Sequence, residues 1–217
     1  MRGKGFLAIW SDIEPSQLTD YLHWLTREHA SERIGTVGFL AVRVFRARSI
    51  DTIRIFILYE LDAPGVLSSE DYLGRLNAPT PWTQRIMPTL GNFIRGGGES
   101  IASAGIGQGG IIAVLALKEM PGDGARLAAD IAALDRIAAV RVLATNRAGT
   151  AVQTQEKSMR GNDRYFGGLL IIEALDQDGL EHALARLQQR TPSLRTDPDI
   201  PVLSYAQIFA LNRVLFT

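Results

Sequence analysis

The feature of this sequence that most restricts its fold is a pattern of strands and helices that occurs twice. The segment GFLAIW at 5–10 is typical of a strand, and GIIAVLAL at 110–117 aligns with it at an offset of 105 residues. Apolar residues then recur at helical spacing near 18–29 and again near 127–137. Because such repeats decide how a chain divides, they govern the rest of the interpretation.

Each half continues with two further strands, a second helix and a closing strand. The second strands are GFLAVRVFRA at 38–47 and AVRVLATNRA at 139–148, and the third strands carry an acid at Glu60 and Glu173. The order βαββαβ, written twice, is a ferredoxin-like pattern. We therefore predict an α+β fold in which two tandem ferredoxin-like units pack their antiparallel sheets face to face as an intrachain α+β barrel. That packing would bury the sheet face that the helices of each unit leave uncovered.

The boundary between the halves is predicted in the glycine-rich segment 101–110, which gives repeats at 1–104 and 105–217. Within it, GIGQGG has the spacing of a dinucleotide-binding loop, but a strand-like run follows where that loop needs a helix. A linker is therefore favoured. A single domain with a parallel sheet is disfavoured, because few residues separate the second and third strands of the first half. In the second half the matching connection, at 149–163, is expected to be a mobile polar loop.

Composition excludes several classes of protein. The 217 residues include 23 basic and 23 acidic side chains and no cysteine. Thiolate chemistry, cysteine-ligated zinc and iron–sulfur clusters are therefore excluded. The balanced charge offers no general attraction for nucleic acid or anionic membranes, and no apolar run approaches the roughly 18 residues of a membrane-spanning helix. We expect a cytoplasmic protein with no nucleic-acid or membrane partner.

The densest group of polar and aromatic residues lies at 21–33, YLHWLTREHASER. His29 continues the apolar stripe of its helix and should point toward the sheet, whereas the matching helix of the second half is aliphatic there. Two interpretations stay open: a satisfied core histidine, or a functional group in an apolar cleft. His23 lies about 240° around the helix from His29 and cannot act with it. No metal site is predicted, because H-E-x-x-H and similar spacings are absent.

All three tryptophans lie in the first half, where they could line a pocket or belong to the core. Trp82 shares the proline-punctuated segment NAPTPWTQRIMP with Arg85. On the second strand, Arg43 and Arg46 lie on opposite faces, so one of them should face the helices. There it would pair with an acid such as Glu28, or bind the carboxylate of a ligand.

The segment DYLHWLTREHASERIGTVGFLAVRVFRA resembles the helix-to-strand part of EthD-like proteins, in the dimeric α+β barrel superfamily. There, a helix ending in a W-x-x-x-E-H-like run leads through a V-G-F turn into a strand that carries arginine. The matching residues are Trp24, Glu28, His29, Gly38, Phe39 and Arg43. Members of this superfamily pair two units into a barrel, usually in a homodimer. The resemblance implies that this chain forms the pair from one polypeptide, as a monomeric pseudo-dimer or a homodimer.

Members of the superfamily commonly use a cleft between sheet and helices. We predict a single pocket in the first half that binds a small hydrophobic or aromatic acid. His29 would act there as a general acid or base together with Glu28. The substrate-binding residues are predicted to be Trp24, Arg43, Trp82 and Arg85.

Whether the protein is an enzyme stays open at this point. One hypothesis is a cofactor-independent monooxygenase, cyclase or isomerase, and no cofactor is predicted for it. The alternative is a non-enzymatic binding or assembly module in which the polar cluster is a salt-bridged helix end. Haem binding, which the superfamily also includes, is a third hypothesis.

Overall fold

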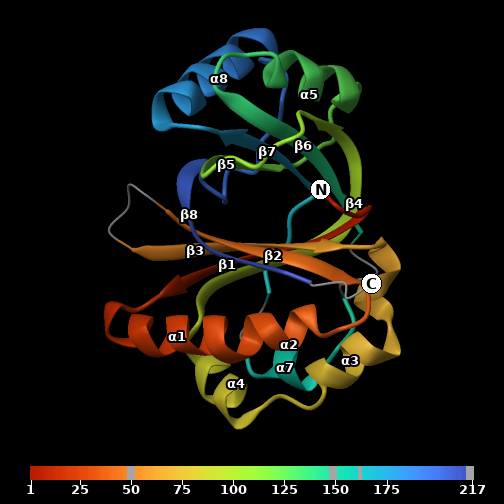
Figure 1. The fold of residues 1–217 in the computed structure, drawn as a ribbon, viewed down its shortest axis with the longest axis vertical. Coiled ribbons are helices and arrows are strands. Elements are labelled where there is room, and N and C mark those ends of the chain that lie inside the picture. The colour runs from red at the N-terminus through yellow and green to blue at the C-terminus, as the bar shows by residue number, and fades with distance from the viewer. Residues whose placement is uncertain (48–51, 147–150, 161–162, 214–217) are drawn as a thin grey trace.

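The computed structural model describes residues 1–47, 52–146, 151–160 and 163–213. Within these residues, eight strands form one closed barrel in the order β1-β3-β2-β8-β5-β7-β6-β4, and every neighbouring pair is antiparallel (Figure 1). The strands are β1 (Gly5–Ile13), β2 (Phe39–Ala47), β3 (Ile53–Leu61), β4 (Gly91–Ala104), β5 (Ile111–Leu117), β6 (Ile137–Thr145), β7 (Gly168–Ala174) and β8 (Leu203–Asn212).

Helices cover two opposite sides of the barrel (Figure 1). On the side of α5 (Gly124–Ala132) and α8 (Gln177–Arg190), both helices come from the second half of the chain. The other side carries η1 (Pro15–Gln17), α1 (Leu18–Trp24), η2 (Leu25–His29), α2 (Ala30–Ile34), η3 (Pro64–Ser68), α3 (Glu70–Leu76), α4 (Pro81–Ile86), η4 (Met87–Thr89) and α7 (Gln155–Ser158). Among the described helices, none combines the length and apolar character needed to cross a lipid bilayer.

The predicted arrangement of two ferredoxin-like sheets packed face to face is wrong. The strands of the two halves are joined edge to edge, because β2 pairs with β8 and β4 pairs with β6. The physical reason is that each four-stranded sheet would leave two edges with unpaired backbone N–H and C=O groups. Closing all strands into one barrel pairs these edges, and the inner sheet faces then form the barrel interior.

Two long strands make this closure. The first part of β4 pairs with β1 and its last part pairs with β6, while β8 pairs with β5 at its start and with β2 further on. Gly98 stands where β4 contacts both neighbours, and a Cβ atom there would collide with the backbone carbonyl of Ala144. Gly98 therefore allows a close approach of backbones, and Gly96 leaves room for the Phe166 ring.

Three hydrophobic cores result, counted over the described residues. One lies between β1–β3 and the helices of the first half, and another lies between β5–β7 and α5 with α8. The third fills the barrel interior, where the Trp10 ring contacts those of Phe56 and Phe166. Side chains of this third core fill the barrel interior, whereas the cavity beside His29 lies outside the barrel, between the sheet and the helices of the first half.

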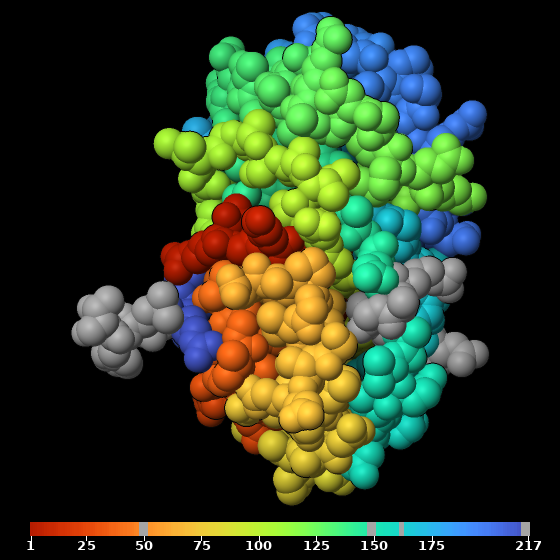
Figure 2. Space-filling model, turned by 90° about the vertical axis from the view of Figure 1, so that its right-hand side faces the viewer, coloured from red at the N-terminus to blue at the C-terminus, as the bar shows by residue number. Residues whose placement is uncertain are grey.

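The connection at 149–163 was expected to be a polar loop, but part of it is helical. Residues 151–160 include the short helix α7, whose first turn is capped by the Thr154 hydroxyl. Although it belongs to the second half, this segment lies on the surface beside α3 of the first half (Figure 2). Positions 149–150 and 161–162, also part of that expectation, lie outside the described residues.

Candidate functional site

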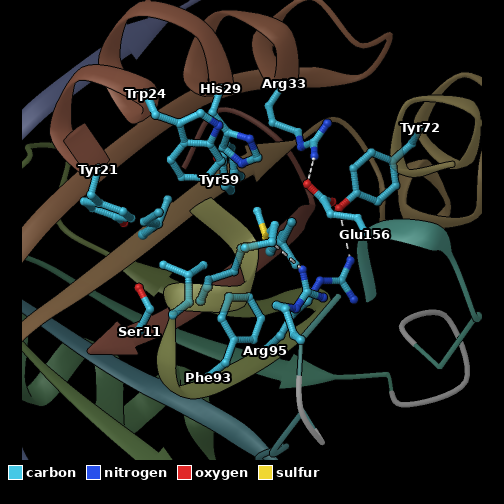
Figure 3. Close-up of a pocket in the computed structure, with 16 residues that line it drawn as sticks. Ser11, Tyr21, Trp24, His29, Arg33, Tyr59, Tyr72, Phe93, Arg95 and Glu156 are labelled. Carbon is cyan, nitrogen blue, oxygen red and sulfur yellow. Dashed lines mark hydrogen bonds and ion pairs between the residues drawn. The ribbon is translucent and has the colours of Figure 1, made fainter. Parts of the chain in front are cut away.

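A small cavity lies between the first helical run and the outward-facing side chains of β1, β3 and β4 (Figure 3). Its volume is about 30 Å³, which is room for about one water molecule. The lining combines aromatic, aliphatic and charged side chains: Leu7, Ile9, Ser11, Tyr21, Trp24, His29, Arg33, Ile57, Tyr59, Tyr72, Met87, Leu90, Phe93, Arg95, Glu156 and Arg160.

The helical side of the cavity depends on a π-helical turn, η2, between α1 and α2. In an α-helix, residues five apart point in directions about 140° apart. In η2 the amide of Ala30 bonds to the carbonyl of Leu25, five residues earlier, so residues at this spacing lie one above the other. Trp24 and His29 consequently stack, with ring centroids 4.2 Å apart and planes inclined by 32°. This extra residue in the turn places both rings on the cavity wall.

His29 is a neutral imidazole held in a buried site. Its Nδ1 atom has no hydrogen-bond partner among the described residues. Burial, and then the positive charges of Arg33 and Arg160, hold the pKa of His29 well below its usual value of 6.5. At neutral pH the ring therefore keeps one unprotonated nitrogen that can accept a hydrogen bond or a proton.

Two buried tyrosine hydroxyls lie on the same wall. Tyr59 Oη has no hydrogen-bond partner within the described part of the chain, whereas Tyr21 Oη faces the hydroxyl of Ser11. Burial raises the pKa of both phenols, and a side-chain hydrogen bond with Ser11 opposes this rise at Tyr21. Both tyrosines thus remain protonated donors. A buried hydroxyl without a partner, such as that of Tyr59, lowers stability by about 1–3 kcal/mol.

The opposite end of the cavity is charged. Arg33 Nη2 donates to Glu156 Oε1 at 2.6 Å, and Arg95 Nη2 donates to Tyr72 Oη at 3.0 Å (Figure 3). Burial opposes the charge of Arg33, but Glu156, Tyr72 and Glu32 outweigh it and raise the pKa of Arg33. Arg160 lies 4.2 Å from the centroid of the Phe93 ring. The cavity therefore has an aromatic, neutral end and a cationic end.

The structure places two of the predicted site residues, His29 and Trp24, on the cavity wall. Trp24 Nε1 donates to Thr83 Oγ1 at 3.1 Å, which fixes the indole. Glu28, predicted to act with His29, instead accepts a hydrogen bond of 2.6 Å from the hydroxyl of Thr80, the N-cap of α4. It makes no hydrogen bond to His29 Nδ1.

The other predicted residues lie outside the cavity lining. Arg43 points into the barrel, where it donates to Glu173 at 2.7 Å and to Gln207 at 2.8 Å. Trp82 Nε1 donates to Asp20 at 3.0 Å, and the exposed Arg85 pairs with the same carboxylate at 3.2 Å. The structure therefore does not bring Arg43, Trp82 or Arg85 together with His29.

Sequence reasoning missed most of the remaining polar wall. Tyr21 belongs to the aromatic cluster at 21–33 and Tyr59 to a predicted core strand, so the sequence does not mark either as a site residue. Nothing in the polar run 151–160 signals that Glu156 becomes buried against the first half. The stacking of Trp24 on His29 depends on the π-helical turn, and a turn of five residues is too short to change the hydrophobic periodicity of the sequence.

The cavity does not fit a haem group at His29. A cavity of about 30 Å³, with room for about one water molecule, is far too small for a haem group, and the imidazole face is occupied by Trp24. His23 is partly exposed and His182 is exposed. Across the described residues, no three histidine, aspartate or glutamate side chains gather as metal ligands would.

No protein-family model matches the sequence, and no curated protein matches it either. Solved structures do match the fold. A proposed monooxygenase from Fusobacterium nucleatum has a TM-score of 0.59 at 12% identity, covering 98% of this chain and 96% of that one. An anthrone oxidase-like protein has a TM-score of 0.58 at 11% identity, covering 98% and 94%.

Chlorite dismutase from Candidatus Nitrospira defluvii, solved with imidazole, has a TM-score of 0.54 at 10% identity and covers 96% of this chain and 92% of that one. Identities this low show a shared fold and do not transfer an activity. The neighbours share the α+β barrel fold, whereas membership of the dimeric α+β barrel superfamily and the narrower likeness to EthD-like proteins stay predictions. This chain has the α+β barrel fold of monooxygenase-like and chlorite dismutase-like proteins.

Proposed function

We propose that the protein binds a small aromatic or hydrophobic molecule at the cavity beside His29, and that the lining side chains move apart to admit it, because the cavity as it stands has room for about one water molecule. One observation carries the proposal: two buried polar atoms, His29 Nδ1 and Tyr59 Oη, are unpartnered within the described residues and belong to one cavity wall, beside the hydroxyl of Tyr21. Native proteins pair nearly all such atoms, so two on one wall indicate groups reserved for a ligand. The stacked Trp24 and His29 rings supply an aromatic surface beside them.

The arrangement suits proton transfer to or from such a ligand. A neutral imidazole accepts a proton from an acidic hydroxyl or C–H group, and the two phenols donate hydrogen bonds to the oxygen on which negative charge develops. Cofactor-independent oxygenation, cyclisation and isomerisation can all begin with this step. We therefore propose His29 as the general base, with Tyr21 and Tyr59 as donors to the ligand.

A thermal-shift screen with 4-hydroxybenzoate, phenol and hexanoate tests the binding proposal. At 100 times its dissociation constant, a ligand adds about 2.7 kcal/mol to the free energy of unfolding. For a chain of this size that raises Tm by roughly 5–10 °C. We expect 4-hydroxybenzoate to stabilise the wild type. His29→Ala should lose the shift, whereas His182→Ala, at an exposed histidine on α8, should keep it.

Tyr59→Phe separates a reserved hydroxyl from an ordinary core tyrosine. Because it removes an unpartnered buried group, we expect this variant without ligand to unfold at a higher temperature than the wild type. The same variant should bind 4-hydroxybenzoate less tightly. The proposal fails if no probe binds the wild type, or if both His29→Ala and Tyr59→Phe bind every probe as the wild type does.

A second candidate, a non-enzymatic module, is favoured by the small volume of the cavity. One water molecule could bridge the polar atoms that the cavity presents. The indole of Trp24 and the α4 cap would then serve only to fix the helices. This candidate predicts that every probe leaves Tm unchanged, and that His29→Ala lowers Tm to the same extent with and without probe.

A further inference from the structure

At the cationic end of the cavity, the carboxylate of Glu156 from the second half of the chain binds Arg33. Along 151–160, only Thr154 and Glu156 are buried, and the remaining residues are exposed or partly exposed. The Glu156 side chain is 5% exposed and reaches Arg33, whose side chain is 4% exposed. A buried carboxylate in an otherwise polar surface segment requires a specific partner, and Arg33 provides it.

Glu156 also separates two small cavities. The cavity beside His29 has a neighbour of about 20 Å³, lined on one side by Leu67, Leu73 and Leu76. Arg95, Glu156 and Arg160 line both spaces, which measure about 30 and 20 Å³. Movement of the Glu156 side chain would therefore join the two spaces and give a longer pocket with an apolar far end.

Several other contacts hold helix α7 and its flanks in place. The amide of Gln155 donates to Asn77 Oδ1 at 3.1 Å beside α3, and Met159 packs against the core of the first half. Further along, Arg160 packs on Phe93 and pairs with Asp163 at 3.3 Å. The four residues of α7 are too few to form a stable helix without tertiary contacts. The Arg33–Glu156 ion pair is a buried attachment of this element.

The charges suit an exchange of one carboxylate for another. Three arginines line the cavity. Glu156, the acid among the described lining residues, pairs with Arg33, while Asp163 outside the lining pairs with Arg160. Arg33 keeps a second, longer ion pair with Glu32 at 3.4 Å at the rim, outside the cavity lining. Arginine binds carboxylates in a planar, two-point geometry, so a ligand carboxylate can replace that of Glu156.

The spacing of the helix defines the size of the ligand. His29 and Arg33 are four residues apart, so their Cβ atoms lie about 5–6 Å from each other on one helix face. A single aromatic ring against Trp24 and His29 places a directly attached carboxylate beside Arg33. We propose that Arg33 is the anion subsite of this pocket for a one-ring aromatic carboxylate, and that Glu156 occupies the subsite until the ligand displaces it. This inference rests on the proposed function of the His29 site.

Calorimetric titration with benzoate and with benzyl alcohol, which has the same ring without the charge, tests the displacement. Since Glu156 competes with the ligand, Glu156→Gln should bind benzoate about tenfold more tightly than the wild type. Benzyl alcohol should bind both proteins equally. Glu32→Gln is the matched control, because it removes a charge from the same arginine without opening the cavity, and its benzoate affinity should match that of the wild type.

The double variant Arg33→Met with Glu156→Gln removes the ion pair without leaving either buried charge alone. It should keep benzyl alcohol binding and lose its preference for benzoate. Hydrogen exchange on the unaltered protein gives an independent readout. Saturating benzoate should make the amides of 155–158 exchange about tenfold faster, because α7 then leaves its site, whereas benzyl alcohol should not.

Each result decides between the two proposals. If benzyl alcohol binds in a His29-dependent way but Glu156→Gln does not improve benzoate binding, the anion subsite is wrong and the proposed function stands. Slower or unchanged exchange at 155–158 with benzoate would also overturn the displacement. If neither probe binds the wild type or Glu156→Gln, the proposed function fails together with this inference.

Discussion

His29 combines two properties that rarely occur together, complete burial in the helix–sheet core and a ring nitrogen without a partner. A buried histidine normally satisfies its ring nitrogens, because an unpartnered polar atom lowers stability. The neighbouring cations add to the effect of burial and keep the ring neutral. The same arrangement that makes His29 a suitable base therefore makes the folded state sensitive to pH.

This sensitivity has a definite sign. In the folded protein His29 stays neutral well below pH 6.5, whereas in the unfolded chain it takes up a proton near 6.5. Below that pH the unfolded state binds one more proton, so the free energy of unfolding falls, by at most about 1.4 kcal/mol per pH unit. The contribution is complete above pH 6.5 and is lost as the pH falls toward the folded pKa.

Urea unfolding of the wild type and His29→Gln between pH 7.5 and pH 5 measures this loss. The wild type should lose more stability than His29→Gln over the acidic part of that range. His182→Gln, at an exposed histidine, should behave as the wild type does. Equal pH dependence in the wild type and His29→Gln would contradict a neutral buried imidazole.

For single residues, the sequence predicted His29 and Trp24 as site residues, and both line the cavity. The signal was a difference between the halves, because the helix near 127–137 is aliphatic where the helix near 18–29 carries these two rings. It could not lead to Glu156, because burial of that side chain depends on a tertiary contact with Arg33, 123 residues away. Nor could strand alternation decide which arginine of β2 faces the helices. A register shift occurs between Phe39 and Ala41, and alternation beyond it places Arg43 inside the barrel.

Among the elements, β7 has the most unusual interior residue. Glu173 is fully buried and accepts hydrogen bonds from Arg43 of β2 and Arg141 of β6, both at 2.7 Å, and from the amide of Gly109 at 3.1 Å. One carboxylate thus connects strands from both halves with the segment between them. Glu60 of β3 is also fully buried, but its Oε2 accepts from the Arg2 amide and its Oε1 has no partner in the described chain.

This difference predicts unequal effects of two chemically identical substitutions. Glu173→Gln leaves two buried arginines without their counter-charge, and we expect it to lower the free energy of unfolding by about 3–5 kcal/mol. Glu60→Gln removes no ion pair and should cost about 1 kcal/mol. Thermal unfolding of both variants provides the comparison. Similar losses in the two variants would show that Glu173 does not connect the strands as described.

The strands and their order along the chain could be predicted because apolar runs and turns mark them locally. Their closure into one barrel could not. Hydropathy shows which face of a strand is buried, but the pairing of sheet edges depends on backbone groups that every residue carries. The two strands that close the barrel, β4 and β8, each pair with one neighbour at their start and with another further on. The sequence of side chains carries no signal for this change of neighbour.

At the scale of the molecule, the two halves depend on each other through strand pairing, a buried carboxylate and a docked helix. Their strands pair at β2–β8 and β4–β6, Glu173 joins arginines from both halves, and α7 of the second half reaches Arg33 of the first. We propose the division at 104/105 as the boundary between repeats. Each half alone would then expose two sheet edges and the apolar face that now forms the barrel interior.

We therefore expect that residues 1–104 and 105–217, produced separately, do not form stable folded monomers. Mixing them should restore a complex of the full size, because the barrel interior and both strand pairings form only when the halves meet. Circular dichroism and size-exclusion chromatography of each half, alone and mixed, measure this. A cooperative thermal transition from an isolated monomeric half would contradict it and would show that closure of the barrel is not needed for folding. Glu173→Gln in the second half should weaken the mixed complex, since that carboxylate joins the halves from inside the barrel.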